Sequence, residues 1–280
     1  MYVSTYSTYN MHAGVFQLAT KPGPGGAPVR VLCLHGFRQT AEGFYGRTHA
    51  FRRALRHVAV FDFLEGEVEL AHPAEREGSG EGRDERGDTA EAGNAHGTGG
   101  ESCAAVSGQG ASRRTGARPR KCWWREDKLA DGTVSTRGWR EAVDTVLRHL
   151  CTAGPYQGIC GFSQGGALAA LVCKHIQSLG NTDAVAAFNV RFVMLFGAYN
   201  LSLVDVIPRA EIRVPSLHVW GAQDCTVDAA SSQALASTFI NAQVHKHPGG
   251  HYIPTSPADR DIYRSFIANV CQDRENVTSG

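Results

Sequence analysis

One serine of the sequence stands where a nucleophile would be expected. Ser163 lies in the pentapeptide Gly-Phe-Ser-Gln-Gly of residues 161–165, after an apolar run that predicts a short strand over 158–162 and before a small-residue run that predicts a helix. A serine on such a sharp turn is held in a strained conformation, in the arrangement called a nucleophile elbow. The flanking Gly161 and Gly165 leave room that side chains would fill. The bare pattern is weak evidence and also fits a glycine-rich turn, so the prediction depends on its setting between strand and helix.

A serine hydroxyl needs a base to take its proton and a third group to orient that base. Of the twelve histidines, His251 alone follows the last predicted strand, and the paired glycines before it let the loop bend back over the strand ends. We therefore predict His251 as the general base. His218 lies inside a predicted strand, where a core histidine is expected, and His35 is expected to shape its loop.

The acid of such a triad is expected between the serine and the histidine in chain order. Asp224 comes directly after the predicted strand that ends at Gly221, at the edge where a parallel sheet delivers its active groups. Asp228 competes, but it fits better as the N-cap of the following helix, and Asp205 precedes the strand. We predict Asp224.

An oxyanion hole requires two backbone N–H groups that point to the developing charge. Gln164 would supply one from the start of its helix. The other is expected from the loop after the first predicted strand, with Phe37 as the first choice and Arg38 as the second. Phe37 would also add apolar surface to an acyl pocket.

Strands and helices that could position these residues alternate along the chain. This alternation predicts the α/β fold class, with a mostly parallel central sheet and helices on both faces. The helices are expected over about 40–57, 139–150, 165–172 and 228–240, and the strands over about 29–35, 58–64, 158–162, 191–197, 214–221 and 243–247.

Residues 65–120 differ in composition from the rest of the chain. From 71 to 120 the sequence holds 11 of the 32 glycines, no aromatic residue except histidine, and Val106 as the only large aliphatic residue. Such a segment buries too little apolar surface to offset its ordering entropy. We predict one domain over residues 1–280, with 65–120 as a disordered, glycine-rich insertion within it.

The net charge and the spacing of the cysteines restrict the kinds of binding partner that the sequence predicts. The formal net charge of +1 creates no strong field for nucleic acid or anionic lipid, so small-molecule partners are expected. The eight cysteines show no spacing that suits zinc, and residues 161–166 do not fit the dinucleotide pattern Gly-x-Gly-x-x-Gly. We predict no metal, no cofactor and no membrane span, and a soluble, cytoplasmic protein with the nucleus as a second compartment.

Several motifs together resemble the FSH-type family of serine hydrolases, over about residues 28–64 and 121–270. The resemblance implies an α/β-hydrolase fold, an esterase or thioesterase activity, and a triad of Ser163, Asp224 and His251. The short connection between Gly197 and Val214, where many hydrolases insert a lid, separately predicts a small or absent cap. Gly166 replaces the usual alanine, and residues 65–68 replace an acidic-small-Pro-His stretch. The motifs are residues 34–37, Trp123-Trp124, 154–158 running into 161–165, 215–221 with Asp224 and Val227, and 247–251.

Three functional hypotheses follow. The first is hydrolysis of carboxylic esters through an acyl-enzyme on Ser163, and the second is hydrolysis of thioesters of coenzyme A or protein by the same residues. The third is a non-catalytic interaction protein that keeps the fold and binds through 65–120. The short connection from Gly197 to Val214 favours an open groove, with Trp123, Trp124 or Tyr199 as walls.

Overall fold

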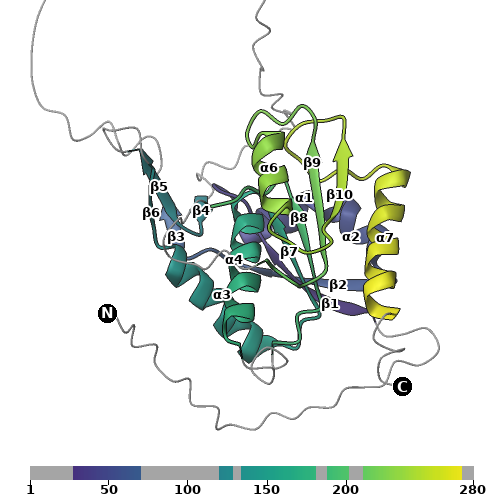
Figure 1. Ribbon diagram of the computed structural model, residues 1–280, viewed down its shortest axis with the longest axis horizontal. Helices are drawn as coiled ribbons and strands as arrows, with labels where there is room; N and C mark the ends of the chain where they lie inside the picture. The colour runs from purple at the N-terminus through teal and green to yellow at the C-terminus, as the bar shows by residue number, and fades with distance from the viewer. Residues whose placement is uncertain (1–27, 71–119, 129–133, 181–187, 202–210, 273–280) are drawn as a thin grey trace, which may run out of the picture.

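The computed structural model describes residues 28–70, 120–128, 134–180, 188–201 and 211–272 (Figure 1). A six-stranded sheet lies at its centre, with the strand order β10-β9-β8-β7-β1-β2 and with every neighbouring pair parallel. This confirms the predicted fold class. The strands are β1 (Val29–Leu34), β2 (Ala59–Leu64), β7 (Gly158–Phe162), β8 (Phe192–Phe196), β9 (Ser216–Gly221) and β10 (Gln243–His247).

Two hydrophobic cores cover the two faces of this sheet. Along β1, Leu32 and Leu34 point into one core, and Val31 and Cys33 point into the other, because side chains alternate along a strand. The first core takes its helical residues from α3 (Trp139–Ala153), α4 (Gln164–Ser178) and α6 (Ala229–Ala236). The second takes them from α1 (Ala41–Arg47), α2 (His49–Leu55) and α7 (Pro257–Gln272).

Helix α3 shows how the sequence pattern becomes packing. Its apolar residues recur at helical spacing and are all buried: Trp139, Ala142, Val143, Val146, Leu147 and Leu150. Each large apolar side chain removed from water contributes about 1.5–3 kcal/mol, so this stripe fixes the helix on the sheet. It packs beside α4, whose first residue follows Ser163.

Two small antiparallel sheets lie beside the central one, on the side away from α7 in the view of Figure 1. One pairs β3 (Val68–Leu70) with β4 (Arg120–Cys122), and the other pairs β5 (Arg125–Lys128) with β6 (Val134–Arg137). None of these four strands was predicted. Residues 65–70 and Arg120, which the prediction placed in the insertion over 65–120, are described, and they include β3 and the first residue of β4. Residues 71–119 lie outside the described part of the chain.

Two other predictions of helices need correction. The single helix expected over 40–57 is two helices, because Thr48 leaves helical geometry and its hydroxyl donates to the carbonyl of Phe44 at 2.8 Å. The helix expected to run to residue 240 ends at Ala236, where α6 passes into a turn. Helix α7 follows the last predicted loop and was not predicted at all.

Candidate active site

Ser163 occupies a strained turn between β7 and α4. Its backbone has φ 53° and ψ −120°, a conformation that L-residues rarely adopt. Its N–H donates to the carbonyl of Phe196 at 2.8 Å, which ties the turn to the end of β8. At Gly165 a Cβ atom would lie 2.2 Å from the carbonyl oxygen of Leu34, so only glycine fits this close approach of α4 to β1. The geometry is that of the predicted elbow.

Asp224 and His251 form a hydrogen-bonded pair in which the carboxylate is buried and the imidazole is partly exposed. Oδ2 of Asp224 lies 2.6 Å from Nδ1 of His251, and Oδ1 accepts hydrogen bonds from the N–H groups of Thr226 and Val227, each at 2.9 Å. The carboxylate is only 1% exposed. Because a carboxylate can only accept, the proton of the ring lies on Nδ1, and Nε2 has the free lone pair of a base.

The pair lies next to the elbow. The ring of His251 is 4.6 Å from the ring of Phe162, the residue before Ser163. Gly197, at the end of β8, has φ 51°, and a Cβ atom there would lie 2.9 Å from the His251 ring. No hydrogen bond joins Ser163 Oγ to His251 in the described residues; the side-chain partner of the His251 ring is Asp224.

Asp228, the competing acid, has the structural role predicted for it. Its Oδ1 accepts from the N–H of Ser231 at 2.6 Å, which makes it the N-cap of α6. The same hydrogen bond lowers the pKa of this carboxyl group, because it stabilises the ionised form. Asp205 lies outside the described residues.

The two predicted donors of an oxyanion hole, Gln164 and Phe37, lie at the start of α4 and in the turn after β1. Gln164 is the first residue of α4, where backbone N–H groups have no partner within the helix and the helix dipole is positive. Phe37 lies in the turn after β1, closed by the hydrogen bond from Gln39 N–H to the carbonyl of Gly36 at 3.2 Å. Arg38, the second choice, has φ 62°.

The side chains of Gln164 and Trp123 connect the start of α4 with the loop that contains Phe37. The amide of Gln164 accepts from the N–H of Trp123 at 2.9 Å and donates to the carbonyl of Trp124 at 3.0 Å. In turn the indole N–H of Trp123 donates to the carbonyl of His35 at 2.8 Å, at the start of the Phe37 loop. We name this set of bonds the Gln164–Trp123 bridge. Sequence reasoning missed it, because both tryptophans were interpreted only as pocket walls.

His35 shapes its loop, as the sequence predicted. Its Nε2 accepts from the N–H of Gly66 at 2.9 Å, so Nδ1 is the atom that donates to the carbonyl of Gly36, at 2.8 Å. The ring is fully buried and stacks on Trp123. Burial lowers the pKa of this imidazole, which favours the neutral ring that both hydrogen bonds require.

A comparison with known proteins adds the family. A family model described as "Serine hydrolase (FSH1)" matches residues 26–262. The chain belongs to this family. The prediction of a serine hydrolase is thereby confirmed.

Curated relatives are similar in sequence to this FSH1 serine hydrolase over most of its length. The protein is 35% identical to "Esterase OVCA2" of Mus musculus over 246 residues, which cover 85% of this chain and 95% of the mouse protein. It is 33% identical to "Esterase OVCA2" of Homo sapiens over 249 residues, covering 86% and 96% of the two chains.

Solved structures support the fold of the FSH1 serine hydrolase. A carboxylesterase of Bacillus cereus has a TM-score of 0.53 at 13% identity, with 89% of this chain and 92% of that chain covered. SOBER1 of Arabidopsis thaliana has a TM-score of 0.51 at 16% identity, with 88% and 100% covered. At such identities the likeness concerns the fold alone.

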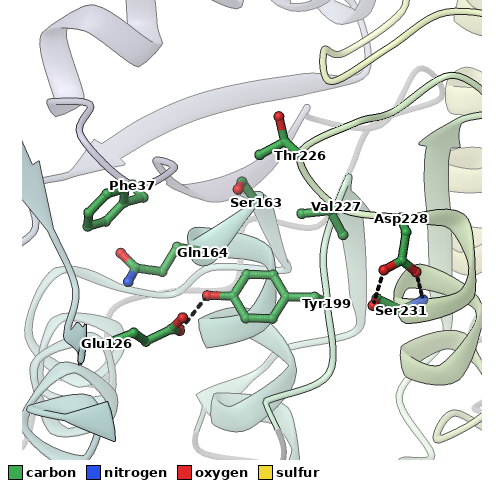
Figure 2. Close-up of a pocket in the computed structure, with 9 residues that line it drawn as sticks. All are labelled: Phe37, Glu126, Ser163, Gln164, Tyr199, Thr226, Val227, Asp228 and Ser231. Carbon is green, nitrogen blue, oxygen red and sulfur yellow. Dashed lines mark hydrogen bonds between the residues drawn. The ribbon is translucent and has the colours of Figure 1, made fainter. Parts of the chain in front are cut away.

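A cavity of about 460 Å³ adjoins the elbow of the hydrolase (Figure 2). Ser163, Gln164, Phe37 and Tyr199 line it, so one of the three predicted aromatic walls is confirmed. Trp123 and Trp124 are instead buried in the core. Glu126 also lines the cavity and was not predicted, because it lies in a run of four charged residues that resembles an exposed surface.

Within the described part of the hydrolase, no group of three or more His, Cys, Asp or Glu side chains could hold a metal ion. In the same residues, no helix is both long and apolar enough to cross a bilayer. A small or absent cap was predicted between β8 and β9. This connection includes residues 202–210, which lie outside the described part of the chain.

Proposed function

We propose that this serine hydrolase cleaves carboxylic esters through an acyl-enzyme on Ser163, with His251 as the general base and Asp224 as the acid that orients it. The 2.6 Å contact between His251 and Asp224, beside a strained serine at the same sheet edge, carries the proposal. The relatives named esterases and the family's description as serine hydrolases support it.

In the first half of the reaction, Nε2 of His251 takes the proton of Ser163 while Oγ attacks the ester carbonyl. Asp224 stabilises the imidazolium that forms. Its other oxygen is held by the N–H groups of Thr226 and Val227, which favour the ionised carboxylate. The negative charge on the substrate oxygen is stabilised by the N–H groups of Gln164 and Phe37 and by the dipole of α4.

In the second half, the tetrahedral intermediate collapses and His251 gives its proton to the departing alkoxide, which leaves as an alcohol. Water then attacks the acyl-enzyme, with His251 again as base. The acid is released and the proton returns to Ser163 Oγ, so the protein ends as it began.

Replacement of Ser163 tests the proposal. We expect Ser163→Ala to lower the turnover of p-nitrophenyl butyrate by at least about 10⁴-fold and to abolish labelling by a fluorophosphonate probe. The control is Ser178→Ala at the exposed end of the same helix, which should keep both. Hydrolysis and labelling that survive in Ser163→Ala would refute the proposal, and unlabelled wild-type protein would favour a binding role.

The same steps would cleave a thioester, with a thiolate as leaving group. A matched pair, p-nitrophenyl butyrate and S-(p-nitrophenyl) thiobutyrate, separates the two activities through the ratio of their kcat/KM values. We expect the oxygen ester to be the better substrate relative to the uncatalysed rates of the two compounds.

A further inference from the structure

Two cavities flank the proposed catalytic residues. The cavity of about 460 Å³ is lined by Ser163, Gln164 and Phe37, and a second cavity of about 190 Å³ is lined by His251, Phe162 and Tyr252. The histidine must protonate the leaving group, so the alcohol has to depart on the side of His251. The acyl group then occupies the larger cavity, which contains the serine and both oxyanion donors.

Charge distinguishes the two cavities. Among the described residues that line the larger one, Glu126 and Asp228 are acidic and none is basic. The smaller cavity is lined by Arg47 and, in the same described part of the chain, by no carboxylate. An acyl group that enters the larger cavity therefore meets negative charge.

Glu126 is the carboxylate best placed to act on an acyl group. Its Oε1 accepts from the hydroxyl of Tyr199 at 2.9 Å (Figure 2). The same oxygen accepts from the indole N–H of Trp124 at 2.8 Å. Trp124 is fully buried, so these bonds fix Glu126 to a rigid wall, and among the described residues no hydrogen bond engages its Oε2. Both oxygens of Asp228, by contrast, are engaged by Ser231.

We propose that Glu126 selects acyl groups by charge, so that the hydrolase favours esters of neutral or cationic acids and discriminates against acyl chains that end in a carboxylate. The proposal rests on the proposed ester hydrolysis at Ser163. Two unit charges within a few ångströms interact strongly in a partly enclosed site, but Glu126 is itself exposed to water, which weakens the effect. We expect discrimination of roughly 10- to 100-fold in kcat/KM between cationic and anionic acyl groups.

Three p-nitrophenyl esters test this selection with a constant leaving group. The acids are γ-trimethylammonio-butanoic acid, its neutral isostere with carbon in place of nitrogen, and glutaric acid as its monoester. We expect the wild-type protein to prefer the cationic and neutral esters to the anionic one. Glu126→Gln, which keeps the size and the acceptor for Tyr199, should reduce the ratio of kcat/KM between the cationic and the anionic ester about tenfold, because it removes the charge that distinguishes them.

Asp261→Asn removes an exposed carboxylate of α7 that pairs with Arg264, and it should leave the ratio unchanged. High salt should lower the ratio in the wild-type protein, a measurement that needs no variant. A ratio that is equal in wild type and Glu126→Gln, or a wild-type preference for the anionic ester, would overturn the inference alone. Absence of Ser163-dependent turnover of the neutral ester would instead overturn the proposed function.

Discussion

The carboxyl edge of the central sheet and the β4–β5 segment beside it both reach the candidate site, but they are held in different ways. Ser163, Asp224 and His251 follow strands β7, β9 and β10, and β7 and β9 are buried along their whole length. Residues 120–122 and 125–128 belong to short two-stranded sheets, and hydrogen bonds of single side chains tie this segment to the site. They are the bonds of the Gln164–Trp123 bridge and the bond from Tyr199 to Glu126.

This difference suggests a division of roles. The sheet edge holds the groups that would exchange protons and bonds with the substrate. The β4–β5 segment holds groups that position a donor, through Trp123, or select a substrate, through Glu126. Changes at the sheet edge should therefore remove activity, whereas changes at the segment should only modulate it.

Of the changes that compare the sheet edge with the β4–β5 segment, the largest effect on kcat is expected at Asp224. Asp224→Asn should lower kcat by about 10³- to 10⁴-fold, because an amide can donate to Nδ1 and so favour the wrong tautomer of His251. Asp228→Asn is the matched control, since asparagine is also a good N-cap, and it should keep kcat within about tenfold. A greater loss in Asp228→Asn than in Asp224→Asn would show that the acid is assigned wrongly.

A second prediction concerns His218 of β9, the strand that precedes Asp224; this histidine has no part in the proposed reaction. His218 of β9 is 2% exposed, lies 3.1 Å from Ser216 Oγ through Nε2, and packs on Phe239. Burial lowers its pKa to about 4. Between about pH 6.5 and 4 the unfolded chain therefore binds a proton that the folded chain does not, so stability falls as the pH falls, by an upper limit of about 3 kcal/mol.

Urea unfolding at a series of pH values measures this loss. His218→Gln cannot titrate, so its free energy of unfolding should fall less steeply over this range, whatever constant cost the substitution adds. His57→Gln, a change at an exposed histidine, is the control and should keep the wild-type slope. Parallel profiles for wild type and His218→Gln would contradict the assigned cause.

The parts of the site that could be predicted from sequence depend on short, local patterns. Ser163, Asp224 and His251 each come shortly after a predicted strand, which places them at one sheet edge without knowledge of distant contacts, and β7 and β10 were predicted with the bounds observed. The roles of Asp228 and His35 were also accessible, because N-caps and strand-end loops have local signatures.

What could not be predicted depends on contacts between distant residues. The bond between Trp123 and Gln164 spans 41 positions, and that between Trp123 and His35 spans 88. Strands β3 and β4 have three residues each, which is too short for a pattern that stands out from the sequence, so their pairing across the insertion defines them. The break in the helix at Thr48 reflects one hydroxyl hydrogen bond, which apolar spacing does not reveal.

The smallest of these effects is expected at Gln164, where the two regions meet. Its backbone N–H is a proposed oxyanion donor, and its side chain forms the bridge to Trp123. Gln164→Met keeps the length of the side chain and the backbone N–H but removes both hydrogen bonds. Because the donors would be less well positioned for the transition state, kcat should fall about 10- to 100-fold while KM changes less than about threefold.

Helix α4 offers a matched control at its other end. Gln177 also bridges a backbone carbonyl and an N–H, those of Glu211 and Arg213, at 2.6 and 2.7 Å, so Gln177→Met loses the same kinds of bond. It should lower stability without a change in kcat. A trifluoromethyl ketone, which mimics the tetrahedral intermediate, should bind Gln164→Met more weakly by the factor lost in kcat/KM and should bind Gln177→Met normally. If both variants lost kcat equally, Gln164 would only stabilise the helix, and the bridge to Trp123 would have no positioning role.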